Sequence, residues 1–397
     1  MPIAPFTLEP MPTTVFGPGT SSALAEQIRP HGSRAFVVTD AGVLGAGIVE
    51  PITDALAAQD MEWTVFSGVD PNPTDMNVAA GVDALAAFGL EGTVVVLIGG
   101  GSVMDCGKYI AMAAPSGVTD SSMAFAPDLD GDDKIDFATL MPGSMPTAPG
   151  LPTIAVPTTS GTASETNGGG LITDTATQRK LTFTSPDVRP KSIILDPLLT
   201  VGLPSRATAA CGMDVLTHAL EAFTSNANHP LADAQALHAI SMVAENLPAA
   251  VADGTDIDAR SAMQIASHLA GRAFSSGPLL GLIHATGHPI SAQFHIAHGQ
   301  TLSTMMPHVM RFNRDVVADR YAQVGAALGV AADADAAIAA VEALSVTVGT
   351  NLSLSDLGAT ADDIAGLTTD ALRDLIILNT PRYPTRSEVF ELFTAAL

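Results

Sequence analysis

The pattern of strand-like and helix-like segments changes once along the chain. In the first half, runs rich in β-branched residues alternate with alanine-rich stretches, as in residues 34–40, 63–68, 92–102 and 151–162. This alternation is typical of parallel strands joined by crossover helices. Beyond residues 202–210 no further strand-like run occurs, and apolar residues recur at helical spacing. The sequence therefore predicts an α/β domain followed by an all-α domain.

The length of the chain also favours two domains, because single hydrophobic cores stop growing at roughly 250–300 residues. We place the expected boundary near residue 190, which gives an α/β domain over 1–190 and a helical domain over 191–397. Residues 115–150 are rich in Pro, Gly and Asp, and we expect a surface excursion there. Its segment DLDGDDKID lacks the Gly and Glu that an EF-hand calcium loop requires, so a solvated turn is the favoured interpretation.

Charge and composition argue against several classes of partner. The chain has 17 Lys and Arg against 41 Asp and Glu, which disfavours a nucleic acid or an anionic membrane surface. It contains no apolar run of the roughly 20 residues that a membrane span needs, and its N-terminus does not have the pattern of a signal peptide. The only cysteines, Cys106 and Cys211, are expected to be reduced thiols. We therefore expect a cytoplasmic protein with a small-molecule substrate.

Four of the ten histidines lie within the segment GLIHATGHPISAQFHIAH. His284 and His288 are four residues apart, so they share one face of a helix, and Asp214 and His218 repeat this spacing in GMDVLTHALEAF. His298 follows ten residues after His288. One carboxylate and three imidazoles that converge between helices would form a divalent metal site. An isolated D-x-x-x-H pair is more often structural, but the joint pattern favours a metal site.

Two loops of small residues point to a nucleotide. The stretch GGGSVMDCGK (99–108) follows an apolar run and precedes a helical stretch, which places glycines at a helix N-terminus suited to a phosphate. By itself this pattern fits a tight strand-to-helix turn equally well. PTTSGTASE (157–165) is a second such loop after a strand. Asp40 ends a predicted strand, where its carboxylate would accept from a ribose hydroxyl and repel a 2′-phosphate, or would cap the next turn.

Taken together, these segments resemble the iron-containing (group III) alcohol dehydrogenase family, which has the dehydroquinate synthase-like superfold. The resemblance runs through almost the whole chain, in the family's order: GVDPNPT, GGGSVMDCGK, PTTSGTASE, LITD, DPLLTVGLP, GMDVLTHALEAF, GLIHATGHPISAQFHIAHG, MPHVMRFN and PRYPTR. It implies a Rossmann-like dinucleotide domain, an all-α metal domain and an active site between them. It also implies a metal-dependent, NAD(H)-dependent alcohol dehydrogenase or aldehyde reductase.

The resemblance assigns roles to individual residues. Its metal ligands fall on Asp214, His218, His284 and His298. His288 matches a histidine beside the nicotinamide and substrate, and we expect it to pass a proton between the substrate oxygen and solvent. His295 matches no functional position, so we expect a surface or packing residue. The cofactor positions fall on Asp40, Gly100, Gly101, Ser102, Asp105, Thr158, Thr159, Thr162 and Lys180.

The identity of the metal rests on the resemblance. A carboxylate with three imidazoles and no thiolate suits Fe(II), Zn(II), Mn(II), Co(II) or Ni(II), and the Irving–Williams order does not favour iron. The family points to Fe(II), with Zn(II) as the alternative. The family also forms dimers and larger assemblies, so we expect a homo-oligomer.

The main alternative is a non-redox lyase of the same superfold, in which bound NAD is recycled within each turnover. The D-x-x-x-H and H-x-x-x-H-x9-H patterns favour the dehydrogenases. A metal hydrolase or a non-catalytic metal protein would have no use for the paired nucleotide loops.

The sequence departs from the family in two places where substrate contacts are expected. TNGGG (166–170) stands where the family has bulkier residues, and its glycines either widen the pocket beside the nicotinamide or loosen a strand. Residues 272–284 are one residue longer than usual and carry Pro278. Arg272 in this stretch is compatible with an anionic substrate or with a salt bridge on a helix surface.

Overall fold

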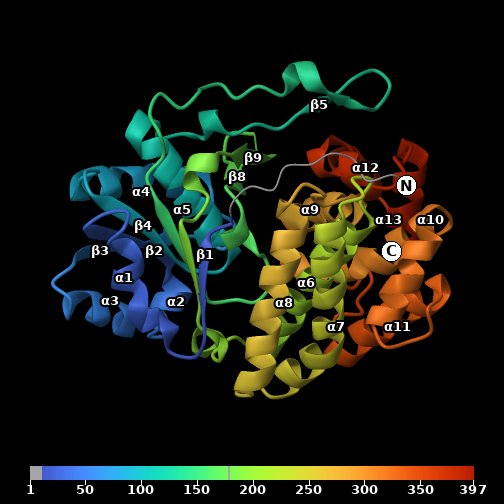
Figure 1. The fold of residues 1–397 in the computed structure, drawn as a ribbon. Coiled ribbons are helices and arrows are strands. Elements are labelled where there is room, and N and C mark those ends of the chain that lie inside the picture. The colour runs from blue at the N-terminus through green and yellow to red at the C-terminus, as the bar shows by residue number, and fades with distance from the viewer. Residues whose placement is uncertain (1–10, 178) are drawn as a thin grey trace.

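The computed structural model describes residues 11–177 and 179–397 and places an α/β unit beside a helical unit (Figure 1). The strands are β1 (Thr13–Phe16), β2 (Arg34–Asp40), β3 (Glu62–Val69), β4 (Thr93–Gly99), β5 (Asp128–Leu129), β6 (Ile135–Asp136), β7 (Thr153–Pro157), β8 (Gly169–Asp174), β9 (Arg179–Thr184) and β10 (Ser192–Leu195). The α-helices are α1 (Leu24–Ile28), α2 (Ala41–Gly45), α3 (Val49–Ala57), α4 (Asp75–Phe88), α5 (Gly101–Ala113), α6 (Ser205–Thr224), α7 (Pro230–Ala252), α8 (Ile257–Ser275), α9 (Leu282–Phe294), α10 (His298–Ala327), α11 (Ala334–Val348), α12 (Ile364–Arg373) and α13 (Arg386–Ala396).

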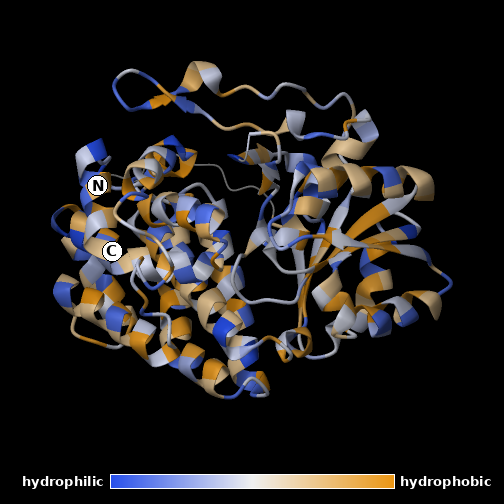
Figure 2. Ribbon diagram, turned by 180° about the vertical axis from the view of Figure 1, so that it is seen from behind, coloured by the Kyte–Doolittle hydropathy of each residue, from blue (hydrophilic) through white to orange (hydrophobic). Residues whose placement is uncertain are grey.

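Six strands form one parallel sheet in the order β1-β10-β7-β4-β2-β3. Its central strand β4 is buried along its whole length. Val94, Val96 and Ile98 pack with α1 and α3 on one face, and Val95 and Leu97 pack with α4 and α5 on the other. Figure 2 shows the apolar strands enclosed between these helices. This doubly covered sheet confirms the α/β N-terminal domain.

The carboxyl ends of β2, β3, β4 and β7 meet at one edge of this sheet. From β2 the chain continues to the outer strand β3, whereas from β4 it continues to β7 on the opposite side, so the strand order reverses between β2 and β4. Doubly wound sheets bind nucleotides at such a reversal, outside the carboxyl ends of the strands. The loops that follow Gly99 and Pro157 both begin at this edge.

The sheet extends beyond the expected boundary at residue 190. Strand β10 (Ser192–Leu195) lies between β1 and β7 and pairs with both in parallel. The residues that follow the expected boundary therefore still belong to the α/β sheet, because the apolar run SIIL completes it. We propose that the domain boundary lies between β10 and α6.

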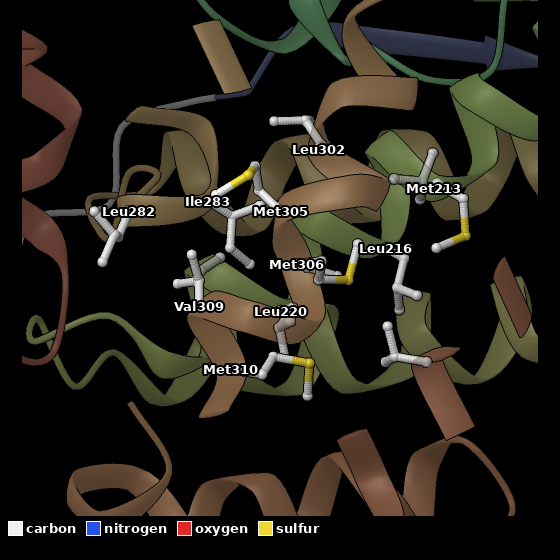
Figure 3. Packing of buried hydrophobic residues seen from close by; sticks show 14 of the residues in the cluster. Met213, Leu216, Leu220, Leu282, Ile283, Leu302, Met305, Met306, Val309 and Met310 are labelled. Atoms are coloured by element: carbon white, nitrogen blue, oxygen red, sulfur yellow. The ribbon is translucent and has the colours of Figure 1, made fainter. Parts of the chain in front are cut away.

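Helices α6 to α13 form the second unit, which confirms the all-α C-terminal domain. Its core joins the helices that carry the predicted metal ligands: Figure 3 shows Met213, Leu216 and Leu220 of α6 packed with Ile283 of α9 and Met306 of α10. In the part of the chain that the structure describes, no helix is long and apolar enough to cross a lipid bilayer.

The excursion within residues 115–150 passes from the α/β unit across to the helical unit (Figure 1). We call residues 125–139, which include the β5–β6 hairpin, the strap. Its turn is closed by Asp130, whose carboxylate accepts from the backbone N–H groups of Asp132 (2.8 Å) and Lys134 (3.0 Å). The segment weighed above as a calcium loop is thus the turn of a hairpin.

Gly299 sets how closely α10 approaches α6. A Cβ on Gly299 would lie 1.9 Å from the carbonyl oxygen of Ala210 and 3.2 Å from Cβ of Asp214. We expect Gly299→Ala to destabilise the protein by about 1–3 kcal/mol, because the backbone of α6 would have to move. Gly366→Ala in α12 is the matched control: nothing lies within 4 Å of its Cβ, so it should be neutral or stabilising. Thermal unfolding of both variants measures this difference, and equal midpoints would contradict the prediction.

Candidate active site

Three helices bring the four predicted metal ligands together. Asp214 and His218 share one face of α6, His284 lies on α9, and His298 begins α10. Asp214 Oδ1 lies 3.4 Å from Nε2 of His218, 3.7 Å from Nε2 of His284 and 3.8 Å from Nε2 of His298. The carboxylate oxygen is thus the point on which the three imidazoles converge.

The donor atoms of this cluster fit a divalent ion. Asp214, His284 and His298 each offer one ligand atom, and these three atoms lie within 4.8 Å of one another; His218 lies beside this group. Among the described residues, two of the converging atoms, Asp214 Oδ1 and His284 Nε2, are buried without a hydrogen-bond partner. Such atoms are costly unless an ion or water satisfies them. Burial also lowers the pKa of His218 to about 4, so its imidazole is neutral, as a ligand must be.

Glu221, one turn after His218 on α6, holds the next ligand in place. Its carboxylate accepts from the backbone N–H groups of Gly281 (2.9 Å) and Ile283 (2.6 Å) and contacts Nδ1 of His284 at 2.6 Å. Burial lowers the pKa of His284, but Glu221 and Asp214 outweigh burial and raise it to about 9. Two buried carboxylates therefore favour a positive charge at this position, and a carboxylate behind a ligating imidazole is a common support for a metal.

His288 connects this cluster to a pocket. Its ring stacks on that of His298, with centroids 5.2 Å apart, and its Nδ1 lies 2.5 Å from Oδ2 of Asp374. Burial raises the pKa of the Asp374 carboxyl, but His288 outweighs burial and the net shift is downwards. Both residues line a pocket of about 130 Å³ whose other walls include Leu171, Arg179, Lys180, Thr182, Pro289 and Arg373.

The two glycine- and threonine-containing loops lie against each other at the carboxyl edge of the sheet. A Cβ on Gly100 would lie 3.3 Å from Cγ2 of Thr159, and one on Gly101 would lie 2.7 Å from Cγ2 of Thr162. The backbone N–H of Thr158 donates to the last carbonyl of β4 at 3.0 Å. Five of the nine expected cofactor residues thus form one surface at the start of α5.

The polar atoms of three further expected cofactor residues already have hydrogen-bond partners. Ser102 Oγ donates to a backbone carbonyl of the GVDPNPT loop at 2.5 Å. Asp40 caps α2 by accepting from a backbone N–H at 2.9 Å, so the capping role weighed for it is present. Lys180 Nζ lies 3.5 Å from Oδ1 of Asn72, and burial lowers the pKa of this lysine.

Both units of the chain match models of one protein family. Residues 12–197 match the model of the iron-containing alcohol dehydrogenases, and residues 208–397 match the C-terminal domain model of the same family. The chain belongs to the iron-containing alcohol dehydrogenase family. As the resemblance implied, it is an alcohol and aldehyde oxidoreductase that uses NAD(H) and a divalent metal ion. Nothing in these matches favours the lyase.

Individual relatives align with this iron-containing dehydrogenase over nearly their full length. A probable alcohol dehydrogenase EutG of Salmonella typhimurium is 36% identical over 387 residues, 97% of this chain and 93% of that protein. A 1,3-propanediol dehydrogenase of Klebsiella pneumoniae is 36% identical over 394 residues, 96% of each chain. The crystal structure of a 1,3-propanediol oxidoreductase superposes with a TM-score of 0.89 at 34% identity, covering 99% of this chain and 100% of that one.

Asp105 and the buried Lys108 join the two cofactor loops of this dehydrogenase. Asp105 accepts from Oγ of Ser164 (2.7 Å) and from the backbone N–H of Leu171 (2.9 Å). Lys108 is fully buried, and its Nζ donates to the carbonyl (2.9 Å) and hydroxyl (2.6 Å) of Ser164. Burial lowers the pKa of Lys108 to about 8, while Asp105 opposes the shift. The hydrogen bonds of Asp105 thus go to the second cofactor loop and to strand β8. Such contacts are compatible with the supporting position that the resemblance implies.

The glycines of the TNGGG segment have a packing explanation in the structure. A Cβ on Gly168 would lie 2.1 Å from the carbonyl oxygen of Ser185, and one on Gly170 would lie 2.7 Å from Cγ of Asp105. The glycines permit close approach, and none of Gly168, Gly169 and Gly170 lines the pocket. Arg272 does not line it either.

Two residues of the site were not found from the sequence, and one histidine lies outside it. Glu221 follows Asp214 by seven residues, two helical turns, and this spacing was a usable signal. Asp374 gave no signal, because it lies 86 residues from His288. His295 is exposed and ends α9 in the left-handed conformation, with φ 55°.

We expect Glu221→Gln to weaken metal binding. Glutamine has one acceptor oxygen for the three donors that Glu221 now accepts, and it removes the charge behind His284. Loss of such a support typically costs about 10–100-fold in metal affinity. Chelator competition with the folded variant measures the loss. Glu245→Gln, on an exposed face of α7, is the control, and equal metal affinities in the two variants would exclude a supporting role for Glu221.

Proposed function

We propose that this enzyme interconverts primary alcohols and aldehydes by passing a hydride between the substrate carbon and NAD(H), at a centre formed by Asp214, His218, His284 and His298. The convergence of these four donors, of which Asp214, His218 and His284 are buried, beside the pocket lined by His288 is the observation that carries the proposal. A divalent metal ion bound there would act as a Lewis acid that polarises a carbonyl oxygen.

The protein's own residues have two tasks in this scheme. The first is placement, because hydride transfer requires the substrate carbon and the nicotinamide in direct contact. The second is proton transfer, which we assign to His288. Since Asp374 occupies Nδ1, the other ring nitrogen is left to exchange a proton with the substrate oxygen. The Asp374 contact also fixes the orientation of the ring.

The cofactor is proposed to lie across the carboxyl edge of the sheet. Gly100, Gly101 and Ser102 begin α5, where backbone N–H groups and the helix dipole favour a pyrophosphate. The loop with Thr158, Thr159 and Thr162 would line the other side of the cofactor. Asp105 would support this loop through its hydrogen bond with Ser164. Lys180 would reach the cofactor from β9, and Asp40, at the end of β2, would favour NAD over NADP.

Three finer assignments follow the family. We propose Fe(II) as the resident ion, with Zn(II) able to occupy the same donor set. We also propose a homo-oligomer and a cytoplasmic location.

The reaction class can be tested with one assay. Metal-stripped protein, reloaded anaerobically with Fe(II) or Zn(II), should oxidise NADH when given aldehydes, because the proposed metal centre and cofactor loops would act on the same substrate. Absorbance at the nicotinamide band measures this reaction, and the apo protein is the control. NADH binding without oxidation by any of a series of small, bulky and anionic aldehydes would contradict the proposal.

We expect His288→Ala to lower turnover by about 10²–10⁴-fold, the usual contribution of a general acid or base, and to retain the metal. Asp374→Asn should give a smaller loss, because the ring nitrogen that exchanges the proton remains. Steady-state kinetics measure the loss of turnover, and elemental analysis measures the metal content of each variant. Loss of metal from His288→Ala would instead make this residue a ligand or its support.

A further inference from the structure

The strap forms part of the wall of the substrate pocket. Ala126 and Pro127 line the same pocket as His288 and Lys180, although they lie in the excursion and not in either domain's core elements. The strap passes above the junction of the two units (Figure 1). This part of the pocket wall is therefore positioned by the contacts of the strap with the two units.

One end of the strap is attached to the α/β unit through the β8–β9 hairpin. The backbone of Phe125 pairs with Thr182 by two hydrogen bonds of 2.8 Å. Arg179 donates to the carbonyl of Pro127 at 2.8 Å and pairs with Asp128 at 3.2 Å. The two pocket-lining residues therefore begin from a fixed position on the hairpin that also carries Lys180.

The far end of the strap is attached to the helical unit. Arg386, the first residue of α13, forms a bidentate pair with Asp133, with Nε–Oδ2 and Nη2–Oδ1 distances of 2.7 and 2.5 Å, and it also donates to Thr369 of α12 at 2.9 Å. Bidentate pairs fix orientation as well as charge. Ile135 is 4% exposed and is part of the helical unit's core. We call Asp133, Arg386 and Ile135 the latch.

We propose that the strap is a specificity-determining wall of the substrate pocket and that its latch limits the size of the aldehyde or alcohol that the pocket admits. This inference rests on the proposed function, since it assigns the pocket to the substrate. The hairpin contacts hold Ala126 and Pro127 at one end, and the latch holds the far end of the strap. With the latch released, the wall would be held at the hairpin alone, and we expect it then to yield to bulkier substrates.

The test uses the full-length, metal-loaded enzyme and two aldehydes, propanal and 3-phenylpropanal. The latch variant is Asp133→Asn with Ile135→Ser: asparagine tolerates the left-handed backbone of residue 133, with φ 59°, so the turn is kept while the bidentate ion pair and the apolar contact are lost. The matched control is Asp335→Asn, which breaks a similar bidentate pair with Arg314 (2.6 and 2.6 Å) elsewhere on the helical unit. Hydrogen exchange of residues 125–139 reports whether the strap is released.

The latch variant should raise the ratio of kcat/KM for 3-phenylpropanal to that for propanal by about tenfold, the scale of a pocket contact. Ala126→Leu should lower the ratio, and the Asp335→Asn control should not change it. Faster exchange of the strap with an unchanged ratio would overturn the inference, and unchanged exchange would overturn the assignment of the latch. Failure of the wild-type enzyme to turn over any aldehyde of the series used in the NADH assay would overturn the proposed function itself, which distinguishes the two failures.

Discussion

The buried carboxylate of Asp214 is the constraint on which the rest of the site depends. It is 2% exposed, and a charge buried to this degree is tolerated only beside compensating partners. Burial raises its pKa, but the surrounding histidines outweigh burial and hold it well below the usual range, so the group stays ionised. With Glu221 also buried nearby, the cluster has an excess of negative charge that a cation balances. Helices α6, α9 and α10 must therefore pack closely enough to deliver their imidazoles, and the contact at Gly299 allows this.

The two units contribute different halves of one reaction site. The sheet delivers two loops to its carboxyl edge, and the buried Lys108 fixes their separation by bonding the second loop from within α5. The helical unit delivers the metal donors and His288. Each half is thus built on rigid elements, and the relative position of the halves depends on the contacts between the units. Hydride transfer is sensitive to such placement.

Sequence reasoning succeeded where the signal was local. Runs of β-branched residues in the first half and helical spacing of apolar residues in the second separated the two units, and four-residue spacing placed Asp214 with His218 on one face of a helix. It failed where the partner is distant in sequence: Asp374 contacts His288 across 86 residues, and the strap reads as solvated loop although Ile135 is buried in another domain's core. The glycines 168–170 were ambiguous, because absent side chains leave space in one context and permit close packing in another. Only the neighbouring atoms distinguish these cases.

The strongly acidic composition bears on how the units are held together. Arginines are scarce in this chain, yet Arg179 and Arg386 are both used to attach the strap, each with a carboxylate partner. These pairs are partly exposed, so dissolved salt weakens them, whereas the burial of Ile135 does not depend on charge. The strap is therefore positioned by a salt-sensitive contact and retained by a salt-insensitive one. Because the same strap supplies two residues of the pocket wall, the proposed selection of substrates by the strap would depend on ionic strength without any change at the metal or the cofactor loops.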